Sequence, residues 1–111
     1  AIRQALEADP GPLLVPAGIL AEITYLVGNR LGARVLDAFL LDLEAGAFSL
    51  ECGELDFSRI RDLVSRYRDM PLGAADASVV ACAERNGGRV LTLDRHFGIV
   101  AREGRIEVLP A

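Results

Sequence analysis

The segment that most constrains the fold is a run of small and apolar residues at positions 74–85. Pro71 and Gly73 precede this run and Asn86-Gly87-Gly88 follows it, and these residues are typical of helix boundaries. The helix predicted here is apolar on almost every side, so other elements must cover it all round. Its alanines allow neighbouring backbones to approach closely. The chain therefore has to place this helix inside its fold.

Strands and helices alternate along the rest of the chain. Short apolar or alternating runs predict strands at 13–15, 47–52, 89–94 and 106–109, the first of them buried. Helical spacing of apolar residues predicts helices at 17–31, 35–43 and 58–69, with a short helical turn at 96–101. The opening residues 1–9 read as the last turns of a further helix. Alternation of this kind indicates βαβ units and a mostly parallel sheet.

Length and composition favour one globular domain. The chain has 111 residues, of which 51% are hydrophobic, so it can build a core without disulfides or a metal. Its two cysteines, Cys52 and Cys82, are interpreted as buried thiols of a cytosolic protein. No apolar run approaches the roughly 18 residues of a membrane span, and no signal-peptide pattern opens the chain. We therefore expect a cytoplasmic protein with no membrane partner.

The charge of the chain is acidic overall but uneven. All 12 basic residues are arginines, and the net charge of −4 argues against a broad nucleic-acid-binding surface. Residues 37–56 carry acidic side chains and no basic one. The outer face of the helix predicted at 58–69 is expected to carry four arginines, Arg59, Arg61, Arg66 and Arg68. Two explanations are open for the use of arginine in place of lysine. It reflects a bias in genome composition, or the arginines line a surface that contacts phosphates.

Three acidic residues lie at positions that packing in a hydrophobic core does not explain. Glu22 lies at the flank of an apolar helical stripe, which is compatible with a solvated edge charge or with a function. Asp76 lies in the first turn of the apolar helix, where the helix dipole favours an anion, but a buried carboxylate there must be paired, hydrogen-bonded or metal-bound. Asp94 ends a predicted strand, so it either caps the next helical turn or lies in a ligand crevice.

Together these residues form a pattern that is similar to a known family. The segments that carry it are Pro16-Ala-Gly-Ile-Leu-Ala-Glu22-Ile, Leu72-Gly-Ala-Ala-Asp76-Ala and Leu91-Thr-Leu-Asp94-Arg-His-Phe97. Their order, and the 18 positions from Asp76 to Asp94, resemble the PIN-domain ribonucleases, in particular the VapC-like toxins of bacterial toxin–antitoxin pairs. The resemblance extends from Leu13 to Leu109 and implies an α/β/α sandwich with a central, mostly parallel sheet.

The resemblance also implies a set of site residues. Glu22, Asp76 and Asp94 would be the catalytic carboxylates that bind Mg²⁺ or Mn²⁺, with Thr92 as a polar support. Oxygen ligands of this kind are those that hard divalent cations prefer. Two alternative roles remain open for Arg95: it contacts a phosphate, or it forms an ion pair with Asp94.

Two positions need a separate interpretation. His96 is expected to be a surface or helix-turn residue rather than a metal ligand, because hard cations rarely bind imidazole. The family opens with a strand that ends in an aspartate, whereas Ala1 begins within the helix that would follow that strand. We therefore expect residues 1–111 to form a single PIN-like domain that lacks its N-terminal strand and its first acidic residue.

The functional expectation follows from the resemblance. It implies a metal-dependent endoribonuclease toxin that cleaves RNA, forms a homodimer and is neutralised by a cognate antitoxin protein. An alternative of a different class is a non-catalytic PIN-like binding module, which would fold and hold a partner without a competent metal site.

Overall fold

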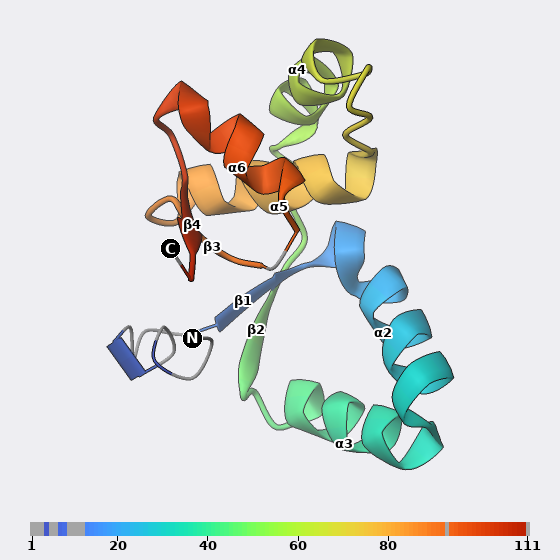
Figure 1. Ribbon diagram of the computed structural model, residues 1–111. Coiled ribbons are helices and arrows are strands. Elements are labelled where there is room, and N and C mark those ends of the chain that lie inside the picture. Colours follow the sequence, from blue (N-terminus) through green and yellow to red (C-terminus); the bar gives the residue numbers. More distant parts are fainter. Residues whose placement is uncertain (1–3, 5–6, 9–12, 93, 111) are drawn as a thin grey trace.

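Helices and strands alternate in the protein, as the sequence predicts. The computed structural model describes residues 4, 7–8, 13–92 and 94–110. Figure 1 shows the elements, which are β1 (Leu13–Pro16), α2 (Ala17–Leu31), α3 (Ala33–Glu44), β2 (Phe48–Glu51), α4 (Phe57–Arg66), α5 (Ala74–Arg85), β3 (Arg89–Leu91), α6 (His96–Val100), the 3-10 turn η1 (Ala101–Glu103) and β4 (Glu107–Leu109). The α/β class is therefore confirmed.

Element ends differ from the prediction in a few places. The helix expected to reach position 69 ends at Arg66, because Tyr67 leaves the helical conformation and the chain then approaches Pro71, which cannot continue a helix. The strand expected at 89–94 ends at Leu91. Of the helix expected at residues 1–9, Gln4, Glu7 and Ala8 are helical, and the other positions lie outside the described residues.

The strands form two parallel pairs. β1 pairs with β2 from Leu13↔Phe48 to Pro16↔Glu51, and β3 pairs with β4 from Arg89↔Glu107 to Leu91↔Leu109. Parallel neighbours need a crossover connection, which α2 and α3 supply for the first pair and α6 supplies for the second. The expected parallel pairing is thus confirmed, while the described strands divide into two pairs instead of one continuous sheet.

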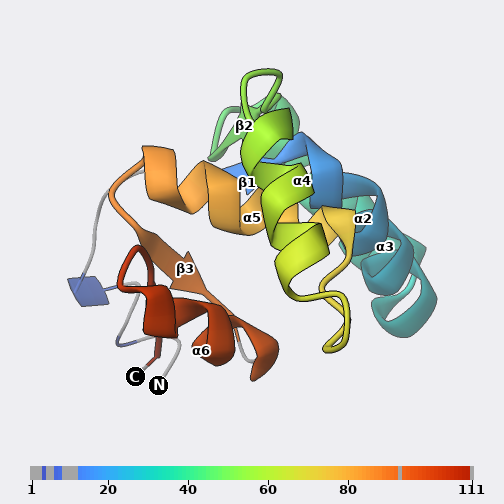
Figure 2. The same cartoon turned by 90° about the horizontal axis from the view of Figure 1, so that it is seen from above.

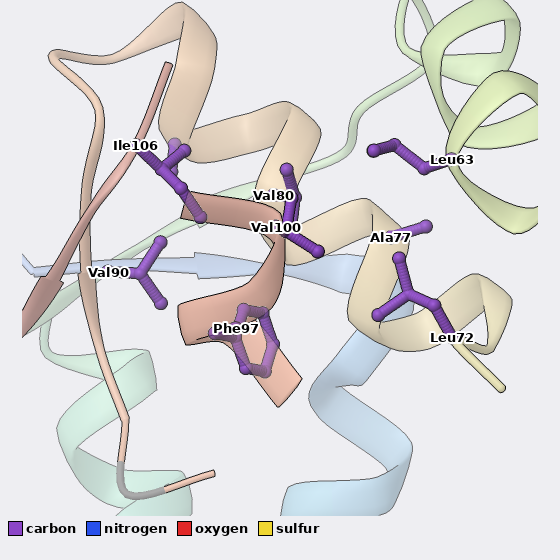
Figure 3. Packing of buried hydrophobic residues seen from close by; sticks show 9 residues of the cluster. Leu63, Leu72, Ala77, Val80, Val90, Phe97, Val100 and Ile106 are labelled. Carbon is purple, nitrogen blue, oxygen red and sulfur yellow. The ribbon is translucent and has the colours of Figure 1, made fainter. Parts of the chain in front are cut away.

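The hydrophobic core is built around α5. As predicted, this helix is buried along most of its length, with Ala77, Val80, Ala81, Cys82 and Ala83 shielded from solvent. In Figure 2, α4 crosses one side of α5 and β3 lies along another. Figure 3 shows the side chains from these elements and from α6 pointing toward one another; the cluster comprises Leu63, Leu72, Ala77, Val80, Ala83, Val90, Phe97, Val100 and Ile106.

The first half of the described chain contributes little to this core. None of residues 13–55 is buried, and in Figure 1 α3 and the later turns of α2 extend below α5, on the side opposite to α4. The expectation of a buried strand at 13–15 is wrong, since Leu13 is 38% exposed. A pair of strands gives each strand only one hydrogen-bonded neighbour, so β1 is not covered as an inner strand of a larger sheet is.

The two thiols have different environments. Cys82 on α5 is buried, as expected, whereas Cys52 is exposed, which corrects the expectation for that residue. Cys52 follows the last residue of β2, where the chain turns at Gly53 with a φ of 72° and leaves the strand. No helix in the described part of the chain is both long and apolar enough to span a membrane.

Candidate acidic site

The three candidate carboxylates come from separate parts of the fold. Glu22 lies in the second turn of α2 and is exposed, and Asp76 lies half-buried in the first turn of α5. Asp94 is exposed and stands between β3 and α6. Because α2 packs against α5, the helices that carry Glu22 and Asp76 lie next to each other.

The charge of Asp76 is influenced by both of the other candidate carboxylates. Burial raises the pKa of Asp76, and the negative charges of Glu22 and Asp94 raise that pKa further, while His96 acts in the opposite direction. The structure therefore places the charges of Glu22 and Asp94 within electrostatic range of Asp76. The fold thus concentrates negative charge at one place.

Asp76 receives little compensation from the protein for this charge. Within the described part of the chain, its carboxylate makes no hydrogen bond or ion pair, and the N-cap position of α5 belongs to Gly73, not to Asp76. Glu22 likewise has no ion-pair partner among the described residues. The helix dipole of α5 remains the only compensation that the described backbone supplies. Such a cluster is suited to attract a cation.

Asp94 is held by short-range contacts on both sides. Its backbone N–H donates to the hydroxyl oxygen of Thr92 at 3.0 Å. Its Oδ1 accepts a hydrogen bond of 2.9 Å from the backbone N–H of His96, and the imidazole Nδ1 of His96 lies 3.1 Å from the same oxygen. Asp94 therefore accepts the N–H of the first residue of α6, one position before the N-cap residue Arg95, which agrees with the capping interpretation, while its role in a ligand crevice stays a prediction.

The neighbours of Asp94 clarify two further positions. Arg95 is exposed, and the described residues provide it with no ion pair, so the pairing with Asp94 that the sequence left open is not formed. His96 is exposed in the first turn of α6, as expected, but its contact with Asp94 was not predicted. The spacing Asp94-x-His96 at a helix start was the signal for it, because an aspartate in this position accepts a hydrogen bond from the backbone two residues later.

The donor set fits a hard cation in an open site. All three candidates provide carboxylate oxygens, and a divalent cation would relieve the repulsion that raises the pKa of Asp76. Among the residues that the structure describes, no three His, Cys, Asp or Glu side chains converge closely enough to hold a metal on their own. Mg²⁺ commonly binds one or two carboxylates and keeps several waters, so an open cluster satisfies its needs.

Comparison with known proteins relates the whole chain to one family. Residues 1–103 match the family described as PIN domain. The chain is also 35% identical over 115 residues to Ribonuclease VapC26 of Mycobacterium tuberculosis (strain ATCC 25618 / H37Rv). That alignment covers 99% of this chain and 85% of the relative.

Proposed function

Because the chain belongs to the PIN-domain family, we propose that it is a metal-dependent endoribonuclease toxin of the VapC type, which cleaves phosphodiester bonds in RNA. The observation that carries the proposal is the packing of α2 against α5, which brings the helices of Glu22 and Asp76 together, while the charges of Glu22 and Asp94 both raise the pKa of Asp76 and no arginine pairs with it in the described structure. The similarity to a ribonuclease over nearly the full chain supports the substrate class.

The proposal assigns a role to each side chain of the site. Glu22, Asp76 and Asp94 would provide the carboxylates for Mg²⁺ or Mn²⁺, with waters completing the coordination, and the bound ion would supply a water of lowered pKa and neutralise charge on the phosphodiester. Thr92 fixes the backbone at Asp94, because its hydroxyl accepts the Asp94 N–H. Arg95 is exposed next to Asp94 and is proposed to contact a phosphate of the RNA.

RNA cleavage by matched variants tests this proposal. Glu22→Gln, Asp76→Asn and Asp94→Asn keep the shape of each side chain and remove its charge, so we expect each to reduce Mn²⁺-dependent cleavage by about 100-fold or more. Glu44→Gln, which neutralises an exposed carboxylate at the end of α3, is the control. An Asp76→Asn protein that cleaves RNA as fast as the parent would refute the mechanism.

The alternative function has its own signature. A non-catalytic PIN-like binding module would show no Mn²⁺-dependent rise in melting temperature and no cleavage by the parent protein. Under the proposed function, millimolar Mn²⁺ raises the melting temperature of the parent, because a ligand that binds only the folded state stabilises it. The Asp76→Asn variant is expected to lose most of that rise.

The proposal includes two protein partners and a compartment. We propose a cognate antitoxin that neutralises the enzyme at its acidic site, and a homodimer that functions in the cytoplasm. Support for a second copy comes from the α2–α3 pair, which buries no residue and leaves large apolar side chains exposed, among them Tyr25, Leu31 and Leu41. Light scattering across a concentration series tests the dimer, and a mass of 11.9 kDa at every concentration would refute it.

A further inference from the structure

The α2 and α5 helices are packed tightly against each other at a glycine. If Gly18 carried a Cβ, that atom would lie 2.6 Å from Oγ of Ser78 and 2.9 Å from Cβ of Ser78. Both distances are shorter than real side-chain contacts, so no larger residue fits at position 18 unless one helix moves. The Ser78 hydroxyl is engaged with its own helix, where it donates to the carbonyl oxygen of Ala75. The missing side chain of Gly18 thus sets how near the two helices come.

This contact is close to the acidic site along both helices. Gly18 lies in the first turn of α2, and Glu22 follows it by one helical turn on the same face. Ser78 and Asp76 both belong to the first two turns of α5. A shift of α2 away from α5 at position 18 would therefore move the Glu22 carboxylate relative to the Asp76 carboxylate.

We propose that Gly18 is a positioning residue, whose lack of a side chain sets the separation of Glu22 and Asp76 and thereby the affinity of the site for a divalent cation. This inference rests on the proposed function, because it assumes that the two carboxylates bind a common cation. It assigns a role in the site to a residue that has no functional group of its own.

The surroundings of Ser78 predict how the clash would be relieved. A cavity of about 180 Å³ is bordered by Gly18, Ala75 and Ser78, so the Ser78 hydroxyl has room to turn away from an added methyl group. The Cβ of Ser78 is fixed by the helix backbone and has no such freedom. Removing the hydroxyl alone should therefore relieve part of the clash, and removing both atoms should relieve all of it.

A graded set of variants tests the proposal through Mn²⁺ affinity, measured by calorimetry on the full chain. Gly18→Ala is expected to raise the dissociation constant for Mn²⁺ by about tenfold, the size of effect seen when residues that orient metal ligands are changed. Gly18→Ala combined with Ser78→Ala should recover part of the affinity. Gly18→Ala combined with Ser78→Gly should return to within about twofold of the parent, because neither clashing atom remains.

A control in the same helix separates positioning from simple destabilisation. An alanine at Gly28 would meet only the flexible Cδ2 methyl of Leu36, at 3.1 Å, on the side of α2 that faces α3. Gly28→Ala should leave Mn²⁺ affinity unchanged, whatever its effect on the melting temperature of the metal-free protein. A folded Gly18→Ala protein with the parent's affinity would overturn the inference.

Two further outcomes are decisive. If Gly18→Ala alone does not fold, the two double variants are compared with each other. The Gly18→Ala, Ser78→Ala protein keeps Cβ of Ser78, and the Gly18→Ala, Ser78→Gly protein does not. Weaker Mn²⁺ binding by the first of these supports the inference, and equal binding by both overturns it. The proposed function is tested separately by Asp76→Asn, which should lose Mn²⁺ binding. A parent protein that binds no Mn²⁺ would overturn the proposed function and this inference with it.

Discussion

The guanidinium of Arg59 and the carboxylate of Glu84 form a bidentate pair, in which Nε donates at 2.9 Å and Nη2 at 2.8 Å. This pair joins α4 to α5. Nη2 also donates to Oε1 of Glu103 at 2.7 Å, and Nη1 donates to Asp62, so one side chain connects α4, α5 and η1. Arg59 was expected on the outer face of α4, but only 18% of its side chain is exposed. That expectation is wrong for Arg59 because acidic residues distant in sequence surround it.

Replacing Arg59 should destabilise the fold without touching the acidic site. Arg59→Met keeps the aliphatic stem and leaves Glu84 and Glu103 without their shared donor, so we expect the free energy of unfolding to fall by about 2 kcal/mol. Urea denaturation at pH 7 measures this change. Arg61→Met in the same helix, where the arginine is exposed, is the control and should change stability by less than about 0.5 kcal/mol. Equal effects of the two variants would contradict the prediction.

Glu103 should make the fold sensitive to acid. Burial alone would raise the pKa of Glu103, but hydrogen bonds from Tyr67, Arg59 and Arg66 outweigh it and lower the pKa from 4.5 to about 2. Since the folded-state pKa is depressed, the stabilisation is complete above the unfolded value near 4.5 and is lost as the pH falls toward 2. Urea denaturation between pH 5 and pH 2 should show a shallower loss of stability for Glu103→Gln than for the parent.

The control for this pH dependence is an exposed carboxylate elsewhere. Glu107→Gln neutralises an exposed residue of β4 and should leave the slope of stability against pH close to that of the parent. If Glu103→Gln and the parent lose stability in parallel as the pH falls, the ion pairs of Glu103 do not contribute as the geometry indicates.

Phe97 is expected to act through packing and not through chemistry. Although it belongs to the segment that resembles a ribonuclease motif, its side chain is 3% exposed and lies within the core cluster (Figure 3). Phe97→Ala should lower the free energy of unfolding by about 3–5 kcal/mol, whereas Phe57→Ala, at a residue that is 65% exposed, should lower it by less than about 0.5 kcal/mol. Thermal denaturation of the two variants checks this, and similar melting temperatures would contradict it.

The sequence predicted the elements of the fold better than their burial. The apolar pattern of residues 74–85 identified the central helix because much of its surface is buried by other elements, which leaves a strong local signal. The same reasoning overestimated the burial of residues 13–15, since an apolar run does not reveal how many neighbours a strand has. Exposure depends on contacts between distant segments, which local periodicity does not contain.

For the candidate site, too, the sequence predicted the residues but not the packing around them. Glu22, Asp76 and Asp94 were predicted from three separate segments, and the structure brings their charges into interaction. The close approach of Gly18 to Ser78 was not predicted, because a glycine in a helix start has several interpretations and its partner is 60 positions away, from 18 to 78. Packing between helices is decided by the tertiary structure, and single residues rarely signal it in advance.

Neutralising Asp76 should stabilise the metal-free protein. Burial and the charges of Glu22 and Asp94 raise the pKa of Asp76, which means that the folded state disfavours its ionised form. Asp76→Asn removes this repulsion, so its urea midpoint at pH 7 in a chelating buffer should be higher than that of the parent. In millimolar Mn²⁺ the order should reverse, because only the parent gains stability from a bound cation. A midpoint that is lower than the parent's in the chelating buffer would contradict the prediction.

Two glycines should respond to alanine with opposite signs. Gly88 connects α5 to the β3–β4 pair: its N–H donates to the carbonyl of Ala83, and its own carbonyl accepts from the N–H of Glu107. Its φ is +80°, and a Cβ there would lie 2.8 Å from the backbone oxygen of Arg105, so the added atom meets backbone that cannot rotate away. Gly88→Ala should therefore lower the free energy of unfolding by about 2 kcal/mol or more, through backbone strain and the displaced carbonyl. Gly98 lies within α6 and has nothing within 4 Å of its Cβ position, so Gly98→Ala should raise the free energy of unfolding by up to about 1 kcal/mol. Urea denaturation of both variants measures the two changes in the free energy of unfolding. Changes of the same sign would contradict either the strain assigned to Gly88 or the helix propensity assigned to position 98.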